Sequence, residues 1–177
     1  MKIRGAFLGL VAAVMTVSSS LPVYADVTDK DIQVLGRAIG FIENGPSGTV
    51  AVAVVYADGD AASEAAADAL AGQIGSGKSA GKLTLNASSV AASALGSAGA
   101  QIILVPNGQA GVYSAVQSAA TSGQGISVSA DKACAEAGAC IIAVATAPKV
   151  EIFISGSASA AAGVNFGSAF RMMIKEL

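Results

Sequence analysis

The sequence contains no histidine and no tryptophan, and it has only two cysteines. The absence of histidine excludes catalysis by Ser-His-Asp and Cys-His groups, and it excludes zinc and iron sites that depend on imidazole ligands. Catalysis would be left to a Ser-Lys pair or to a pair of carboxylates. The sequence therefore predicts no metal site and no cofactor, and it favours a protein that is not an enzyme.

Charged side chains are also scarce, at 12% of the chain, which is about half the usual share. Alanine and glycine are abundant, so we expect a surface of small, weakly polar residues, which would suit a protein that docks onto a partner. The alternative explanation is compositional drift in a GC-rich genome. No basic patch is dense enough to indicate nucleic acid or anionic lipid as a partner.

The first 25 residues have the features of an export signal. Lys2 and Arg4 supply positive charge, residues 6–17 are apolar and uncharged, and Val23-Tyr24-Ala25 offers the small residues that signal peptidase reads. We expect cleavage after Ala25, which leaves residues 26–177 as one periplasmic domain with eight basic and twelve acidic side chains. The alternative is an uncleaved membrane anchor. No cysteine follows the apolar stretch, which disfavours a lipoprotein anchor.

Strand and helix patterns alternate along the first two thirds of this domain. Apolar residues at helical spacing predict a helix over residues 27–42, and an almost unbroken apolar run predicts a central parallel strand over residues 50–56. Further strands are expected at residues 82–86, 101–105 and 125–129, and further helices at 61–74, 88–95, 110–120 and 131–137. This alternation predicts a single three-layer α/β domain, with a mostly parallel sheet and helices on both faces.

The pattern changes near the C-terminus. Two predicted strands, at residues 140–145 and 149–155, are joined only by Thr146-Ala147-Pro148. A link this short cannot make a parallel crossover, so the two strands should form an antiparallel hairpin. A short helical stretch at residues 158–162 and a final helix over residues 166–176 are expected to follow.

Residues 72–79 read G-Q-I-G-S-G-K-S and fit the phosphate-binding P-loop pattern. A P-loop needs a strand before it and a helix after it, so that backbone amides and the helix dipole point at the phosphates. Here a predicted helix comes before the motif and a predicted strand follows it. We therefore interpret the segment as a flexible loop with a solvated Lys78, and we do not expect nucleotide binding.

Cys134 and Cys140 are the only cysteines in the chain. Outside the cytoplasm, a close pair is most simply a disulfide, here one that ties the short helix at residues 131–137 to the strand after it. Closing so small a loop stabilises the fold by roughly 2 kcal/mol. The functional alternative is a redox-sensing pair.

Several polar residues fall at or just past the ends of predicted strands. In open α/β sheets, ligands bind beyond the carboxyl ends of the strands. This position suggests a ligand crevice near Tyr56, Asp58, Asn107, Ser129 and Asp131. The alternative is that the aspartates and the asparagine only form turns, which is their commoner use in loops.

The C-terminal third resembles the YfiR-like family of periplasmic proteins. The matching segments read ISVS, CAEAGAC, IIAV, KVEIFI and AAAGV, and they are followed by FGSAFRM at residues 166–172. The family pattern in this region is a strand, a glycine-containing turn, a hairpin, an alanine-rich stretch and a last helix, and residues 32–41 match its first helix. Ser155 stands where the family usually has asparagine, the first helix has few aromatic residues, and the family's other cysteines have no counterparts.

The resemblance implies a non-enzymatic periplasmic regulator that binds and represses an inner-membrane signalling protein through its periplasmic region. The expected partner is a diguanylate cyclase or a sensor kinase, and disulfides make such regulators redox-responsive. A homodimer is compatible with this function. The sequence leaves two alternatives open, a small periplasmic ligand-binding domain that uses the predicted crevice and a hydrolase that uses serine and lysine.

Overall fold

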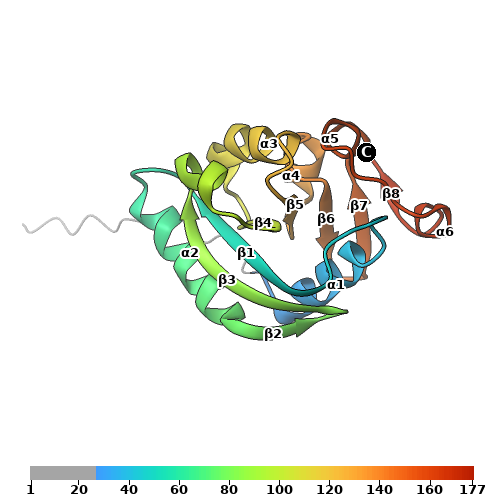
Figure 1. The fold of residues 1–177 in the computed structure, drawn as a ribbon, viewed down its shortest axis with the longest axis horizontal. Helices are drawn as coiled ribbons and strands as arrows, with labels where there is room; N and C mark the ends of the chain where they lie inside the picture. Colours follow the sequence, from blue (N-terminus) through green and yellow to red (C-terminus); the bar gives the residue numbers. More distant parts are fainter. Residues whose placement is uncertain (1–26) are drawn as a thin grey trace, which may run out of the picture.

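The computed structural model describes residues 27–177, and the predicted signal peptide with its cleavage site lies outside these residues. Within the described chain, one eight-stranded sheet has the order β2-β3-β1-β4-β5-β6-β7-β8 (Figure 1). Neighbouring strands from β3 to β6 run parallel. The strands are β1 (Gly48–Tyr56), β2 (Ser76–Ala80), β3 (Leu83–Ala91), β4 (Ile102–Val105), β5 (Ile126–Ser129), β6 (Ile142–Ala145), β7 (Glu151–Ile154) and β8 (Lys175–Glu176).

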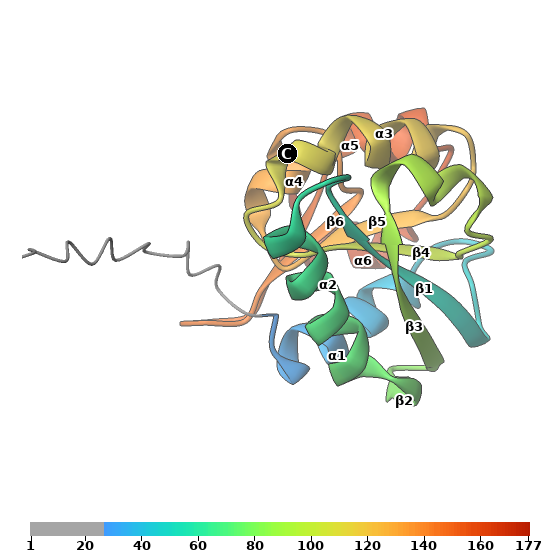
Figure 2. The same cartoon turned by 90° about the vertical axis from the view of Figure 1, so that its left-hand side faces the viewer.

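Helices cover both faces of the sheet, as the sequence predicts. Figures 1 and 2 both place α3, α4 and α5 together on one side, with α1 on the other side. Two large buried clusters fill the spaces, one beneath α1 and α2 and the other beneath η1, α3 and α4, and a small third cluster joins Ala135, Ala143 and Phe153. The helices are α1 (Asp29–Ile39), α2 (Ala61–Ile74), α3 (Tyr113–Thr121), α4 (Lys132–Glu136), α5 (Gly156–Ala161) and α6 (Ser168–Arg171), with 3-10 turns η1 (Ala92–Ser97) and η2 (Ala110–Val112).

The central strands are buried because both of their faces are covered. All four residues of β4 are buried, and Val50, Val54 and Val55 of β1 have no exposed surface. Such strands have no polar face, which explains the unbroken apolar runs in the sequence. The predicted three-layer α/β fold is confirmed, and so is the antiparallel hairpin of β6 and β7.

The region after β3 differs from the prediction. A short strand and then a helix over residues 88–95 were expected, but β3 continues to Ala91 and only the turn η1 follows. All nine residues of β3 pair in parallel with the nine residues of β1. The long edge of β1 offers backbone hydrogen bonds along its whole length, and this tertiary pairing overrides the weak helical signal of the alanines and serines.

The P-loop-like segment is not a flexible loop. Its first residues end α2, and Ser76–Ala80 forms β2, which pairs antiparallel with β3 through the turn at Gly81 and Lys82. The expectation of a solvated Lys78 is also wrong. Its side chain is 20% exposed, and its amine binds Asp29 at 2.6 Å and the carbonyl oxygen of Gln73 at 3.2 Å. Lys78 therefore joins the start of α1 to the end of α2.

The predicted final helix over residues 166–176 is wrong as well. Only Ser168–Arg171 is helical, and the chain then turns back so that β8 pairs in parallel with β7. The amide of Leu177 donates to the carbonyl of Ile154 at 2.9 Å. β7 would otherwise be an open edge, and pairing of its backbone groups favours a strand over a longer helix.

α1 lies unusually close to the hairpin of β2 and β3. A Cβ atom added at Gly36 would lie 2.5 Å from the Cβ of Ala80 and 2.6 Å from its carbonyl oxygen. Only glycine permits this approach, because any side chain at position 36 would overlap the backbone of β2.

Candidate functional site

The sheet has a topological switch point between β1 and β4. The helix that follows β1, α2, packs against one face, whereas α3, which follows β4 through η2, packs against the other. Ligands of open α/β sheets commonly bind at such a point, beyond the carboxyl ends of the strands. Tyr56 ends β1 and Asp58 follows it, while Asn107 comes just after β4. These three predicted residues therefore lie at the switch point.

Asp58 is engaged in holding the chain that follows β3. Its carboxylate accepts a hydrogen bond from the amide of Ser93 at 3.0 Å and another from the Ser93 hydroxyl. These bonds lower the pKa of Asp58 below its usual value. The carboxylate thus anchors η1 to the end of β1, which is the role of a turn-forming aspartate.

Ser129 and Asp131 lie at the end of the next strand, β5. The Ser129 hydroxyl donates to the carbonyl of Val105 at 2.9 Å and accepts from the amide of Asp131 at 3.0 Å. Asp131 caps α4 through the amide of Ala133 at 2.9 Å, and its other oxygen accepts from the amide of Gly108 at 3.2 Å. Both side chains therefore tie the ends of β4 and β5 together.

Sequence reasoning missed two polar residues at the switch point. The buried Ser63, in the first turn of α2, accepts from the amide of Ala57 at 2.9 Å and donates to the side chain of Gln109 at 2.8 Å. Gln109 is also buried and comes from the loop after β4. No periodicity distinguishes Ser63 from the other small residues of α2, although Gln109 sits in a loop that the sequence placed at a strand end. The hydrogen bond between Ser63 and Gln109 therefore joins α2 to the loop after β4, across the switch point.

The surroundings of Tyr56 are acidic. The amides that open α2 already bind the carboxylate of Asp60, at 3.0 Å for Ala62 and 3.1 Å for Ser63. The pKa of Tyr56 is raised, first by desolvation and then by the nearby charges of Glu64, Asp58 and Asp68. An anionic ligand such as a phosphate would therefore meet like charge at this end of the sheet.

A second feature is the C-terminal arm, residues 155–177, which comprises α5, α6 and β8. The ring of Phe170 stacks on the ring of Phe41 with a centroid distance of 4.5 Å, and Phe166 packs beside it. Phe170 is buried, but Phe41 is 47% exposed, Met172 84% and Met173 67%. We call Phe41, Met172 and Met173 the methionine patch. Among residues 27–177, the other exposed large apolar side chains are Val150, at 49%, and Leu177, at 42%.

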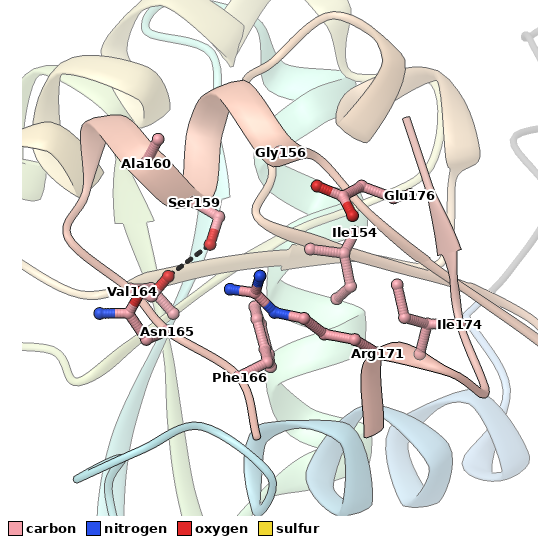
Figure 3. A pocket seen from close by; sticks show the side chains of 10 residues that line it. All are labelled: Ile154, Gly156, Ser159, Ala160, Val164, Asn165, Phe166, Arg171, Ile174 and Glu176. Atoms are coloured by element: carbon pink, nitrogen blue, oxygen red, sulfur yellow. Dashed lines mark hydrogen bonds between the residues drawn. The ribbon is translucent and has the colours of Figure 1, made fainter. Parts of the chain in front are cut away.

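The arm also borders a cavity of about 240 Å³ (Figure 3). Ile154, Phe166 and Ile174 supply apolar surface to it, and Asn165, Arg171 and Glu176 supply polar groups. In the figure, the Arg171 side chain extends across the cavity past Phe166, and Glu176 lies beside Gly156 on another side. This cavity is at the sheet edge formed by β7 and β8, away from the strand ends that the sequence singled out.

Cys134 and Cys140 form the disulfide that the sequence predicts, with Cα atoms 5.2 Å apart. Neither residue has exposed surface, and both pack in the cluster beneath α3. The bond links α4 to the residues that lead into β6. A disulfide buried in this way is shielded from thiols in solution, which favours a structural role over redox sensing.

We also looked in residues 27–177 for metal ligands, membrane-spanning helices and a Ser-Lys pair. Residues 27–177 contain no group of three or more potential metal ligands, and no helix among them is long and apolar enough to cross a membrane. Within the same residues, no lysine amine bonds to a serine hydroxyl, the pair that a histidine-free hydrolase would use. No protein-family model matches the sequence, and no curated protein matches it either.

Proposed function

We propose that the protein is an exported, non-enzymatic regulator that binds the periplasmic region of an inner-membrane signalling protein and represses it. The proposed partner is a diguanylate cyclase or a sensor kinase. The observation that carries this proposal is the methionine patch, because large exposed apolar surfaces commonly mark sites of protein interaction. The predicted export signal and the resemblance to the YfiR-like family supply the compartment and the class of partner.

The methionine patch has the properties of a docking surface. Methionine side chains are flexible and polarizable, so they adapt to an irregular partner surface. Phe41 is held by its stack on Phe170, and the two methionines are the most exposed side chains of the patch. Burying an exposed methionine or phenylalanine contributes about 1.5–3 kcal/mol, so this small patch could supply much of the binding free energy of a transient complex.

Photo-crosslinking in the periplasm tests the proposal. A photoreactive residue at position 172 should capture an inner-membrane signalling protein, and the same residue at position 150 serves as the control. Val150 is also exposed, at 49%, but it lies in the hairpin turn before β7. The double variant Met172→Glu/Met173→Glu should lose the capture and the repression, whereas Val150→Glu should keep both.

A strain that lacks the gene gives the functional readout. The cyclic-di-GMP level is measured when the captured partner is a cyclase, and autophosphorylation of the partner is measured when it is a kinase. We expect the output to rise on deletion and to return to normal with the wild-type gene or Val150→Glu. The proposal fails if position 172 captures no inner-membrane signalling protein and neither output changes. Unfolding curves of the purified variants must match the wild type, since the changed side chains are exposed.

The alternative function is binding of a small ligand at the ends of β1 and β4. The switch point between these strands favours ligand binding there. The buried hydrogen bond between Ser63 and Gln109 disfavours it, because these two side chains occupy part of the switch point. Native mass spectrometry of freshly isolated protein distinguishes the two functions. A co-purifying ligand that is lost in Gln109→Ala would favour the strand-end site over the regulator.

A further inference from the structure

The cavity beside the C-terminal arm combines an apolar floor with two opposite charges. Ile154 comes from β7, Phe166 from the loop before α6, and Ile174 from the segment before β8. Arg171 and Glu176, both from the arm itself, bring a guanidinium and a carboxylate to its sides (Figure 3). The two charges are therefore placed by one short segment of chain around a common apolar surface.

In the described chain, neither charge is neutralised by another side chain. Among residues 27–177, no salt bridge involves Arg171 or Glu176, although Glu151 on the neighbouring strand binds both Lys149, at 3.0 Å, and Lys175, at 2.5 Å. A guanidinium presents a planar fork of donors that matches a carboxylate. A carboxylate in turn accepts hydrogen bonds from an ammonium group. Both groups of the cavity thus remain available to a ligand of complementary charge.

The size of the cavity points to a small molecule. Pockets that bind drug-sized ligands typically span about 300–1,000 Å³, and this one, at about 240 Å³, is smaller. The carboxylate of Glu176 lies beside Gly156, 2.9 Å from where a Cβ atom at that position would stand. A phosphate or a dicarboxylate would meet the negative charge of Glu176, which leaves a zwitterion with an apolar body as the best match.

We propose that this cavity binds a free α-amino acid with an apolar side chain. The carboxylate of the ligand pairs with Arg171, its ammonium group pairs with Glu176, and its side chain packs on Ile154, Phe166 and Ile174. Asn165, at the rim, offers a further amide for either polar group. The site uses Arg171 and Ile174, which flank Met172 and Met173 of the methionine patch, but it uses neither methionine and does not depend on the function proposed above.

Three probes of similar shape separate the contributions of the two charges. They are L-leucine, 4-methylpentanoate, which lacks the amine, and 3-methylbutylamine, which lacks the carboxylate. Titrations of the protein of residues 26–177, followed by amide NMR shifts, should show L-leucine shifting signals of residues 164–176. Arg171 and Glu176 are both exposed, so water screens each ion pair, and each truncated probe should bind roughly two- to five-fold more weakly than L-leucine.

Variants assign each charge to its part of the ligand. Arg171→Met should abolish the preference for L-leucine over 3-methylbutylamine, and Glu176→Gln should abolish the preference over 4-methylpentanoate. Lys82→Met, which removes an exposed lysine outside the cavity, is the control and should bind L-leucine as the wild type does. Met172→Ser/Met173→Ser, which adds no charge next to Arg171, should also bind normally, so failure of the regulator proposal leaves this one standing.

The proposal is overturned if L-leucine at about 10 mM, which is ten-fold above a Kd of about 1 mM, shifts no signal of the cavity. It is equally overturned if both charge variants, shown by amide spectra to be folded, keep the wild-type preferences. Shifts confined to the ends of β1 and β4 would place the ligand at the other site and contradict the assignment to the arm.

Discussion

Asp31, in the first turn of α1, accepts a hydrogen bond of 2.7 Å from the hydroxyl of Thr146, which lies in the turn between β6 and β7. Its other carboxylate oxygen accepts from the amide and the hydroxyl of Thr28, at 2.8 and 2.6 Å. The neighbouring Lys30 donates to the carbonyl of Thr146 at 2.9 Å. The capping box of α1 is thereby joined to a hairpin more than a hundred residues away in sequence, and Asp31 is 6% exposed.

The first prediction concerns Asp31 and pH. Burial acts to raise the pKa of Asp31, but hydrogen bonds from Thr28 and Thr146 and the charge of Lys30 outweigh it, so the pKa lies below the ordinary value of 3.8. A depressed folded-state pKa contributes stability above the unfolded value, and this stability is lost as pH falls through the folded pKa. Asp31→Asn should therefore lower the free energy of unfolding by about 1–3 kcal/mol at pH 7.

The difference in free energy of unfolding between the wild type and Asp31→Asn should become smaller as the pH falls below 3.8. Urea unfolding at pH 7, 5 and 3 measures it. Thr146→Val removes one donor but no charge, so its effect should change less with pH. A difference that stays constant down to pH 3 would mean that the charge of Asp31 does not stabilise the fold.

The second prediction concerns the disulfide. Cys134→Ala/Cys140→Ala should lower the free energy of unfolding by about 2 kcal/mol, because the closed loop is small. Both cysteines are fully buried, so mild reductant should reduce the native protein slowly and only through opening of α4. Intact mass after alkylation measures the free thiols over time. Two thiols already free in periplasmic protein would contradict the bond, and fast reduction of the folded state would favour redox sensing.

The third prediction concerns Lys78. The variant Lys78→Ala should unfold at a lower temperature than the wild type, because it removes the bond to Asp29 and the donor at the end of α2. High salt should reduce the difference, since the pair is partly exposed. Lys82→Ala in the adjacent turn is the matched control and should unfold like the wild type. Equal unfolding temperatures for all three proteins would restore the interpretation of Lys78 as a solvated side chain.

The sequence predicted the elements that depend on local patterns and missed those that depend on distant partners. The run of β1, the boundaries of α2 and the hairpin of β6 and β7 follow from periodicity and link length, and the structure has them. The extension of β3 and the strand β8 arise because β1 and β7 offer backbone groups that must be paired. No local property of Ser88 or Lys175 carries that information.

The candidate site shows the same division. Position in the alternating pattern placed Tyr56, Asp58 and Asn107 at one end of the sheet, where the structure also has them. The pattern could not show that Asp58 binds Ser93, because that contact depends on where η1 packs. The sequence did not predict the cavity beside Arg171. It predicted one continuous helix over residues 166–176, and in such a helix Arg171 and Glu176 would not lie on opposite sides of a cavity.

The fourth prediction concerns the close contact of α1 with β2. Gly36→Ala should destabilise the protein by about 1–3 kcal/mol, because the new methyl group would overlap Ala80. Gly72→Ala is the matched control, since Gly72 also lies in a helix but has no atom within 4 Å of an added Cβ. It should stabilise the protein by about 0.5–1 kcal/mol through the higher helix propensity of alanine. Urea unfolding of both variants measures the contrast, and equal effects would mean that α1 can move away from β2.

Both borders of the sheet are formed by short strands. β2 has five residues and an irregular register opposite β3, and β8 has only two. Neither presents a long, straight row of free amides and carbonyls on which another chain could add a strand. Short border strands are one way in which sheet proteins limit edge-to-edge association. We therefore expect a dimer of this chain to be assembled from side chains rather than from a shared sheet.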